Sequence, residues 1–195
     1  MPRLNSDVDM ASHIPARSGY YLKIPFVWEP GCPLPTQVAQ LRFRTADPDW
    51  LVGALASVLA TSPDPSGQLA VSECGPHQAA VKLIALASPH FEQLPEWWQR
   101  AETVAGQPVG FVLSSVFARE PRTALREGTI FYLGVLPEHR GMGYGHELLA
   151  QATRVLRQVG VGRILCDTAA GNGPMIAAFR VAGYIEKEPW ERPLR

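Results

Sequence analysis

The sequence predicts an α/β domain in which a sheet is flanked by helices. Three segments carry this prediction: a strand followed by a helix near residues 41–59, a hairpin near residues 104–117, and a strand, glycine-rich loop and helix near residues 129–158. A chain of 195 residues that is 46% hydrophobic and 18% charged has the composition of one globular domain, with or without an arm. We therefore expect a folded domain over residues 40–195 and an extended N-terminal arm over residues 1–39.

Prolines are the reason to expect an arm. Each proline removes a backbone donor and fixes φ, so neither a persistent helix nor a central strand is expected in residues 1–39. The apolar stretch from Tyr20 to Trp28 predicts that part of this arm is extended and packs on the domain. The prolines are Pro2, Pro15, Pro25, Pro30, Pro33 and Pro35.

The next segment alternates between apolar and polar residues and then becomes helical. Residues 41–45 fit a half-buried strand, and Asp47 is the expected N-cap of a helix that runs through Leu59. After a loop at residues 63–67, a second helix is expected from Gln78 to Ala87, ended by Pro89. Its expected buried residues are Val81, Leu83, Ile84 and Leu86.

A hairpin is expected in the middle of the chain. Val104 and residues 109–117 are apolar and flank the turn residues 105–108, which include Gly106 and Pro108. Residues 120–128 carry charges and a proline, and we expect them to form the loop to the next strand.

The segment that carries the chemistry begins with the strongest strand signal in the chain. Residues 129–135 are mostly β-branched or aromatic, and Pro137 ends the run. A glycine-rich loop follows, and helical spacing from Leu148 to Val159 ends at Gly160 and Gly162. The loop residues are Arg140, Gly141, Met142, Gly143, Tyr144 and Gly145.

This loop is suited to bind a diphosphate. The first amides of a helix have no partner within the helix, and glycines leave them open to an anion that the helix dipole also favours. Arg140 can add a charge-assisted hydrogen bond. The alternatives are a flexible turn before a surface helix and a Rossmann dinucleotide site with Asp167 as the ribose-binding acid. The Rossmann fingerprint needs a third glycine where His146 stands, and a Walker loop is excluded because Gly-Lys-Ser/Thr is missing.

These residues resemble the GNAT superfamily of N-acetyltransferases. Its motif Arg/Gln-x-x-Gly-x-Gly/Ala is met by Arg140, Gly143 and Gly145, and residues 161–166 resemble the family's next strand. Further matches to the family's spaced positions are Asn172, Phe179, Gly183 and Tyr184. The resemblance covers about residues 41–187, and it implies a mixed, mostly antiparallel central sheet flanked by helices.

The resemblance also implies acetyl-coenzyme A as co-substrate and assigns residues to it. The backbone of Gly134 and Val135 would bind the pantetheine arm, and residues 140–145 would hold the diphosphate with help from His146. Asn172 and Phe179 would contact the cofactor farther along, near the helix opened by Pro174. The expected His146 contribution is its backbone N–H, since it sits on the first helical turn.

Catalysis would require an oxyanion donor and a way to handle the departing thiolate. The family's donor is a backbone N–H near Val135. Its general acid is often a tyrosine, but the matching residue here is Phe179, so water, Tyr144 or Tyr184 are the substitutes considered. Glu127 is a candidate for the general base, and its alternative interpretation is a solvated carboxylate beside Arg126.

The expected function is therefore acetyl transfer from acetyl-coenzyme A to an amine, directly in a ternary complex. The alternative is a non-catalytic acyl-coenzyme A sensor or scaffold, favoured by Phe179 and by the lack of an obvious base. The acceptor is expected to be a small-molecule or peptide amine that residues 41–125 help to recognise.

Composition excludes several other functions. Lys+Arg and Asp+Glu are equal at 18 each, so neither a nucleic acid nor a membrane surface is an expected partner. Cys32, Cys74 and Cys166 are widely spaced, which predicts reduced thiols and no metal site. With no apolar segment near the N-terminus, a cytoplasmic protein is expected, and a homodimer is left open.

Overall fold

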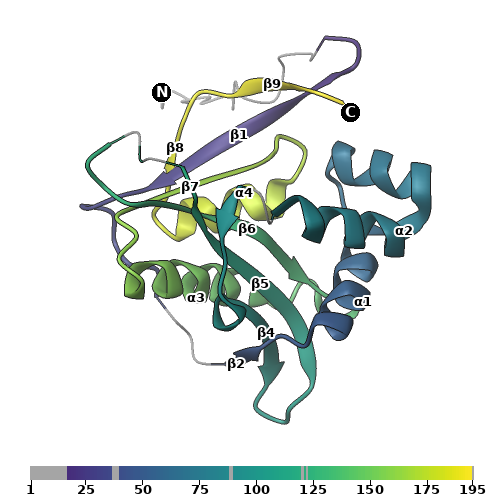
Figure 1. Ribbon diagram of the computed structural model, residues 1–195, viewed down its shortest axis with the longest axis horizontal. Coiled ribbons are helices and arrows are strands. Elements are labelled where there is room, and N and C mark those ends of the chain that lie inside the picture. Colours follow the sequence, from purple (N-terminus) through teal and green to yellow (C-terminus); the bar gives the residue numbers. More distant parts are fainter. Residues whose placement is uncertain (1–16, 37–39, 88–89, 120, 122, 195) are drawn as a thin grey trace, which may run out of the picture.

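The computed structural model describes residues 17–36, 40–87, 90–119, 121 and 123–194. Figure 1 shows the strands as one curved sheet with helices packed on it. The strands are β1 (Tyr20–Trp28), β2 (Leu41–Thr45), β3 (Phe91–Glu92), β4 (Trp98–Thr103), β5 (Pro108–Phe117), β6 (Glu127–Val135), β7 (Arg163–Ala169), β8 (Ile185–Glu186) and β9 (Trp190–Pro193). The helices are α1 (Pro48–Leu59), α2 (Pro65–Ala87), α3 (Tyr144–Gln158) and α4 (Gly173–Val181).

The sheet is mixed and mostly antiparallel, as expected. Its strand order is β2-β4-β5-β6-β7-β1-β8, with β3 added beside β5 and β9 beside β1. The pairing of β6 with β7 is parallel, and the other strand pairs of the described residues are antiparallel. This arrangement contradicts the Rossmann alternative, which requires a mostly parallel, doubly wound sheet.

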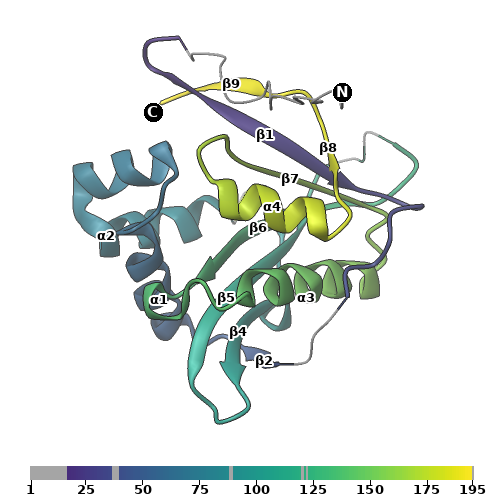
Figure 2. The same cartoon turned by 180° about the vertical axis from the view of Figure 1, so that it is seen from behind.

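Helices cover both faces of the sheet. A Cβ at Gly134 of β6 would lie 3.0 Å from Val58 of α1, whereas a Cβ at Gly110 of β5 would lie 3.2 Å from Leu148 of α3. Seen from the two opposite sides in Figures 1 and 2, α1 and α2 lie together, and α3 and α4 lie together elsewhere on the sheet.

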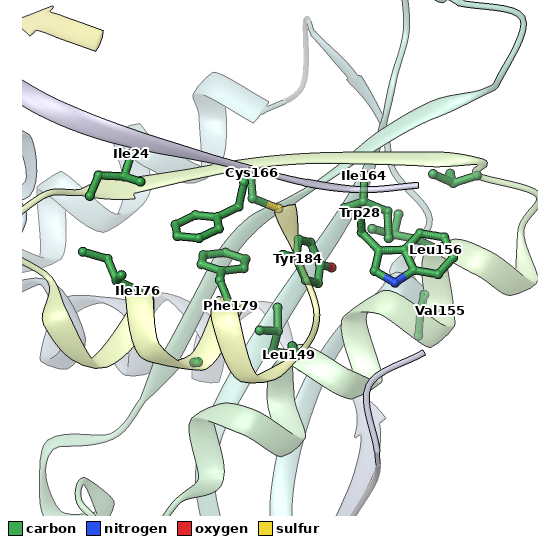
Figure 3. Packing of buried hydrophobic residues seen from close by; sticks show 14 of the residues in the cluster. Ile24, Trp28, Leu149, Val155, Leu156, Ile164, Cys166, Ile176, Phe179 and Tyr184 are labelled. Carbon is green, nitrogen blue, oxygen red and sulfur yellow. The ribbon is translucent and has the colours of Figure 1, made fainter. Parts of the chain in front are cut away.

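The largest core cluster joins α3 and α4 to β1 and β7. Phe26 of β1 stacks on Phe179 of α4 with ring centroids 4.6 Å apart, and Phe179 in turn meets the Tyr184 ring edge-on at 5.1 Å. The Tyr184 hydroxyl is buried and lies 2.7 Å from the Thr153 hydroxyl of α3. Figure 3 shows this cluster, with Cys166 and Trp28 beside the same rings.

The first strand corrects the expected arm. β1 lies inside the sheet, between β7 on one side and β8 and β9 on the other, so the prediction that no central strand persists in residues 1–39 is wrong for residues 20–28. Pro25 is tolerated inside this strand because of the side that its backbone faces. Its carbonyl accepts from Lys187 N, so the N–H that proline lacks would point to the same side, between the residues of β1 that pair with β9 and those that pair with β8. Pro2 and Pro15 lie outside the described residues.

The second helix also differs from the prediction. α2 begins at Pro65, well before the predicted start at Gln78, because Asp64 Oδ1 accepts from the amides of Ser66 and Gly67. Gly75 has φ +77°, so the helix kinks there. The predicted buried residues Val81 and Leu86 are 38% and 61% exposed, and the residues that α2 buries are alanines. Pro89 lies outside the described residues.

Other predicted elements are confirmed with shifted ends. Asp47 caps α1, since its carboxylate accepts from Trp50 N at 2.9 Å. The hairpin is β4 and β5, with Gly106 at φ +85° in its turn. β6 begins two residues earlier than predicted, and β7 runs over 163–169 in place of 161–166.

Candidate active site

The site begins where β6 and β7 separate. Their parallel pairing covers only Glu127 with Arg163 and Gly128 with Ile164, and a register shift in the β5–β6 ladder leaves Phe131 unpaired as a bulge. Beyond this point the two strands diverge. The gap opens into a cavity of about 460 Å³. Its lining combines residues of β6 and β7 with residues of β1, the α1–α2 connection, α2, α3, α4 and β9.

The backbone of β6 decides which groups face the gap. Leu136 N donates to Val109 O, so residues 136, 134 and 132 bond to β5, and the alternate residues Leu133 and Val135 turn their N–H and C=O the other way. Val135 is therefore oriented as expected for a donor in the gap. Gly134 is not oriented toward the gap, because its backbone N–H and C=O face Phe111 of β5. Leu133, in place of Gly134, presents its backbone groups to the gap together with Val135.

The glycine loop presents free amides. Gly141 and Gly143 have φ of +80° and +79°, a conformation that favours glycine, and no Cβ clash stands in front of Gly145. Within the described part of the chain, the N–H groups of residues 141–145 have no hydrogen-bond acceptor. Residues 141–143 are exposed, including Met142 at 57%. The loop therefore has the open amides that an anion needs.

Two side chains flank this loop. The exposed Arg140 bends back so that Nε lies 3.4 Å from Val135 O and a terminal nitrogen lies 3.3 Å from Thr61 O. No carboxylate lies within 4.0 Å of it among the described residues. The His146 backbone N–H already donates to Gly143 O at 3.2 Å, so its predicted contribution to the cofactor site stays a prediction that this bond does not support. Among the described residues, His146 Nδ1 is buried without a partner.

A second cavity of about 390 Å³ adjoins the loop. Met142, Gly143 and His146 form one wall, and Val181 and Ala182 at the end of α4 form another. Pro35, Thr36, Gln40 and Glu147 complete its lining. Glu147 is buried, and its two carboxylate oxygens accept from the amides of Gln40 and Leu41, which fixes the start of β2 against α3.

Asn172 and Phe179 both line the larger cavity. Asn172 is the N-cap of α4, where its side-chain Oδ1 accepts from Met175 N at 3.4 Å and its side-chain amide donates to the Thr168 hydroxyl at 3.1 Å. Phe179 has no proton to donate. Tyr184 is not among the cavity residues, and its hydroxyl is occupied by Thr153, so it does not replace the missing acid.

Glu127 lies at the start of β6, away from the lining of both cavities. It is 2% exposed and lies between two guanidinium groups, with Arg119 at 2.8 Å and Arg163 at 3.1 Å. The carboxylate is thus neither solvated beside Arg126 nor directed at the gap. Its role as a base stays a prediction that this placement does not support.

Sequence reasoning missed a polar group in the larger cavity. Lys23 of β1 is 7% exposed, and its ammonium lies 3.0 Å from Asp64 Oδ2 and 3.1 Å from Asp167 Oδ1. Burial lowers the pKa of Lys23, but the two carboxylates outweigh it and hold the pKa above its ordinary value. Three distant segments supply this bridge, so no local pattern indicates it.

Tyr132 was missed as well, because it sits inside an apolar strand pattern. It lines the larger cavity on the face of β6 that packs against α1 and α2, and its ring stacks on Phe111. Burial raises the pKa of Tyr132 to about 12, although a hydrogen bond with Ser62 opposes the shift. The phenol therefore stays protonated at neutral pH.

Cys166 fills the point where β6 and β7 part. Burial raises the pKa of its thiol to about 12, so it is a thiol and not a thiolate at neutral pH. All three cysteines are free. Among the described residues, no three His, Cys, Asp or Glu side chains gather as metal ligands, and no helix is long and apolar enough to cross a membrane.

Comparisons with known proteins point to one family. Residues 70–184 match the family model described as "Acetyltransferase (GNAT) family". Among curated proteins, mycothiol acetyltransferase from Pseudarthrobacter chlorophenolicus is 27% identical over 157 residues, which is 74% of this chain and 48% of that protein. The same enzyme from Sanguibacter keddieii is 37% identical over 79 residues, 40% of this chain and 25% of that protein. The chain thus spans at most about half of these relatives.

Solved structures support the same fold. A GCN5-related N-acetyltransferase from Sphaerobacter thermophilus has a TM-score of 0.53 at 19% identity. The match covers 91% of this chain and 54% of that protein's chain. A tandem GNAT protein from the clavulanic acid biosynthesis pathway has a TM-score of 0.54 at 18% identity, covering 92% of this chain and 55% of its own.

Proposed function

Since the chain belongs to the GNAT family of acetyltransferases, we propose that it transfers an acetyl group from acetyl-coenzyme A to an amine, directly in a ternary complex. The observation that carries the proposal is the row of unpartnered amides at residues 141–145, at the N-terminus of α3 and beside the gap between β6 and β7. Such amides bind a diphosphate, and the larger cavity lies farther along β6, where Leu133 is part of its lining.

The proposed cofactor path runs along β6. The diphosphate lies on residues 141–145 with Arg140 swung onto it, and the pantetheine arm pairs with the outward backbone groups of Leu133 and Val135. Asn172 and Phe179 line the cavity wall opposite them. The thioester carbonyl then meets the N–H of Val135, which stabilises the developing oxyanion.

Proton handling does not require the missing family tyrosine. A thiol pKa is about 8.5, so the departing thiolate is tolerable near neutral pH. The Tyr132 phenol lines the cavity and remains protonated, so we assign it as a hydrogen-bond donor in the reaction. Its pKa of about 12 makes full proton transfer to the thiolate unfavourable, and water takes the amine's proton.

The substitution Gly145→Glu tests the cofactor site. A Cβ at position 145 meets no protein atom within 4 Å, and a carboxylate in the first turn of a helix is favourable, so the fold tolerates the change. The added negative charge repels the diphosphate, and coenzyme A affinity measured by calorimetry should fall about ten-fold or more. Gly53→Glu in α1, which adds the same charge at another position without a close neighbour, is the control and should bind as the parent does.

Turnover separates the enzyme from the alternative, a non-catalytic acyl-coenzyme A sensor. The free thiol of coenzyme A is followed while acetyl-coenzyme A is incubated with a panel of amines that includes the acceptor of mycothiol acetyltransferases. Thiol release that depends on an amine supports the enzyme. Tight binding of coenzyme A without release for any amine supports the sensor, and no binding at all would refute both.

A further inference from the structure

The charged groups of the larger cavity fall into two sets. Lys23, Asp64 and Asp167 form the bridge described above, while Lys82 of α2 and Arg192 of β9 also line the cavity. Asp64 is fully committed, because its second oxygen accepts from the Ser66 hydroxyl at 2.6 Å and from two amides of α2. Each of its two oxygens therefore already has a donor within the protein.

Asp167 is committed on one side only. Lys23 holds Oδ1 at 3.1 Å, and the side chain is 34% exposed in the cavity lining. The described residues place no donor on Oδ2. This oxygen is the one anionic acceptor that the described lining of the cavity leaves open to a ligand.

Lys82 and Arg192 carry positive charge without an internal partner. Neither lies within 4.0 Å of a carboxylate in the described part of the chain. Arg192 is the cross-strand neighbour of Tyr21, so the two side chains share the face of the β1–β9 ribbon that also carries Lys23. The Tyr21 hydroxyl on this face is buried and has no hydrogen-bond partner among the residues that the structure describes.

The geometry of these groups separates the two charges in space. Asp167 is paired with Pro25, whereas Arg192 is paired with Tyr21, so they lie on opposite sides of Lys23 along β1. A ligand that satisfies both must be bifunctional, with a cationic or amine end at Asp167 and an anionic end at Lys82 and Arg192.

We propose that the acceptor is a primary amine that also carries an anionic group, a carboxylate or a phosphate ester, bound by Lys82 and Arg192 while Asp167 orients the amine. The inference rests on the proposed acetyltransferase function, because it names the substrate class of that site. β1 and β9 lie outside the residues matched by the family model, whereas Lys82 and Asp167 lie within them.

Matched amines test the proposal. Glycine is compared with glycinamide, and phosphoethanolamine with ethanolamine, so that each pair differs in the anionic group. The readout is saturation-transfer NMR in the presence of coenzyme A, together with thiol release from acetyl-coenzyme A. The anionic member of at least one pair should bind about ten-fold more tightly, and the two pairs tell a carboxylate from a phosphate.

Single substitutions test which residues produce the preference for anionic amines. Lys82→Gln and Arg192→Gln should each remove about ten-fold of the anionic amine's advantage and leave coenzyme A affinity and neutral amines unchanged. Lys187→Gln and Arg42→Gln, whose side chains do not line the cavity, should leave the preference intact.

The outcomes separate this proposal from the proposed function. Equal binding of charged and neutral amines, or none of either, overturns the anionic-acceptor proposal even if coenzyme A binds. Loss of coenzyme A binding in the parent protein would instead overturn the acetyltransferase assignment. A preference that survives both variants would also contradict the assignment of Lys82 and Arg192.

Discussion

At the scale of single residues, the phenol of Tyr132 is the group that the reaction depends on in our proposal. Tyr132→Phe should lower kcat about ten-fold or more, because a protonated donor in a buried site is lost. Coenzyme A affinity should not change. Steady-state kinetics measures both, and Tyr20→Phe, outside the lining of the larger cavity, is the control. Unchanged kcat in Tyr132→Phe would remove the residue from the mechanism.

The Lys23 bridge predicts how stability depends on alkaline pH. Because the pKa of Lys23 is raised above 10.5 in the folded protein, the bridge contributes fully below pH 10.5 and is lost as the pH rises through the folded pKa. Lys23→Met should therefore unfold more easily at neutral pH but lose less stability above pH 10.5 than the parent does. Urea unfolding across this range measures the difference, and parallel curves for the two proteins would contradict it.

The same bridge predicts how stability depends on acidic pH. Burial raises the pKa of Asp64, but the Ser66 hydrogen bond and Lys23 outweigh it, so the pKa lies below 3.8 in the folded protein. Stability from Asp64 is thus present above pH 3.8 and falls as the pH drops through the folded pKa. Lys187→Met is a suitable control for both limbs, since no ion pair of the described residues involves that ammonium.

At the scale of elements, α2 is shaped by one glycine. Gly75 has φ +77° and ψ 160°, a region that is nearly restricted to glycine, so Gly75→Ala should destabilise the fold by about 1–3 kcal/mol. Gly53→Ala in α1 should act oppositely and stabilise by about 0.5–1 kcal/mol, because Gly53 lies inside a regular helix with open space at its Cβ. Chemical denaturation measures both. Equal effects from the two substitutions would mean that the kink does not require glycine.

Elements with local signals were predicted well from the sequence. Asp47 before a proline, the turn at Gly106 and the β-branched run into Pro137 each act over a few residues, so the pattern alone identifies them. α2 was half missed because the capping residue Asp64 lies in a proline-rich stretch that favours a loop, and Gly75 and Pro76 break its helical periodicity. Its buried side was half right, since Leu83 and Ile84 pack against the α1–α2 core while Leu86 faces solvent.

The candidate site also contains residues that a local sequence pattern identifies and residues that only the fold brings together. The glycine loop is contiguous, so the sequence alone predicts residues 140–145 together as a cofactor site. The cavity polar groups come from β1, the α1–α2 connection, β6, β7 and β9, and their proximity is set only when the sheet forms. The backbone orientation of Gly134 was likewise hidden, because the bulge at Phe131 fixes which residues of β6 face the gap.

At the scale of the whole molecule, β1 is part of the sheet and not an arm laid over it. Phe26 is fully buried and stacks on Phe179, so Phe26→Ala should cost about 3–5 kcal/mol of unfolding free energy. Tyr20→Ala, at the same strand's exposed end, should change stability little, because Tyr20 is 42% exposed. Thermal and urea unfolding check the pair. Similar small effects from both would mean that residues 20–28 are dispensable for folding.

The place of β1 also orders events during synthesis. Each of its ladder partners lies at residue 164 or later, and Phe26 pairs with Cys166, far along the chain. The strand therefore leaves the ribosome long before a neighbour exists for it, and contacts between such distant residues form slowly. Until β7 emerges, the apolar side chains of β1 stay open to association with other chains or to chaperones, so the yield of folded protein depends on how soon residues 163–169 follow.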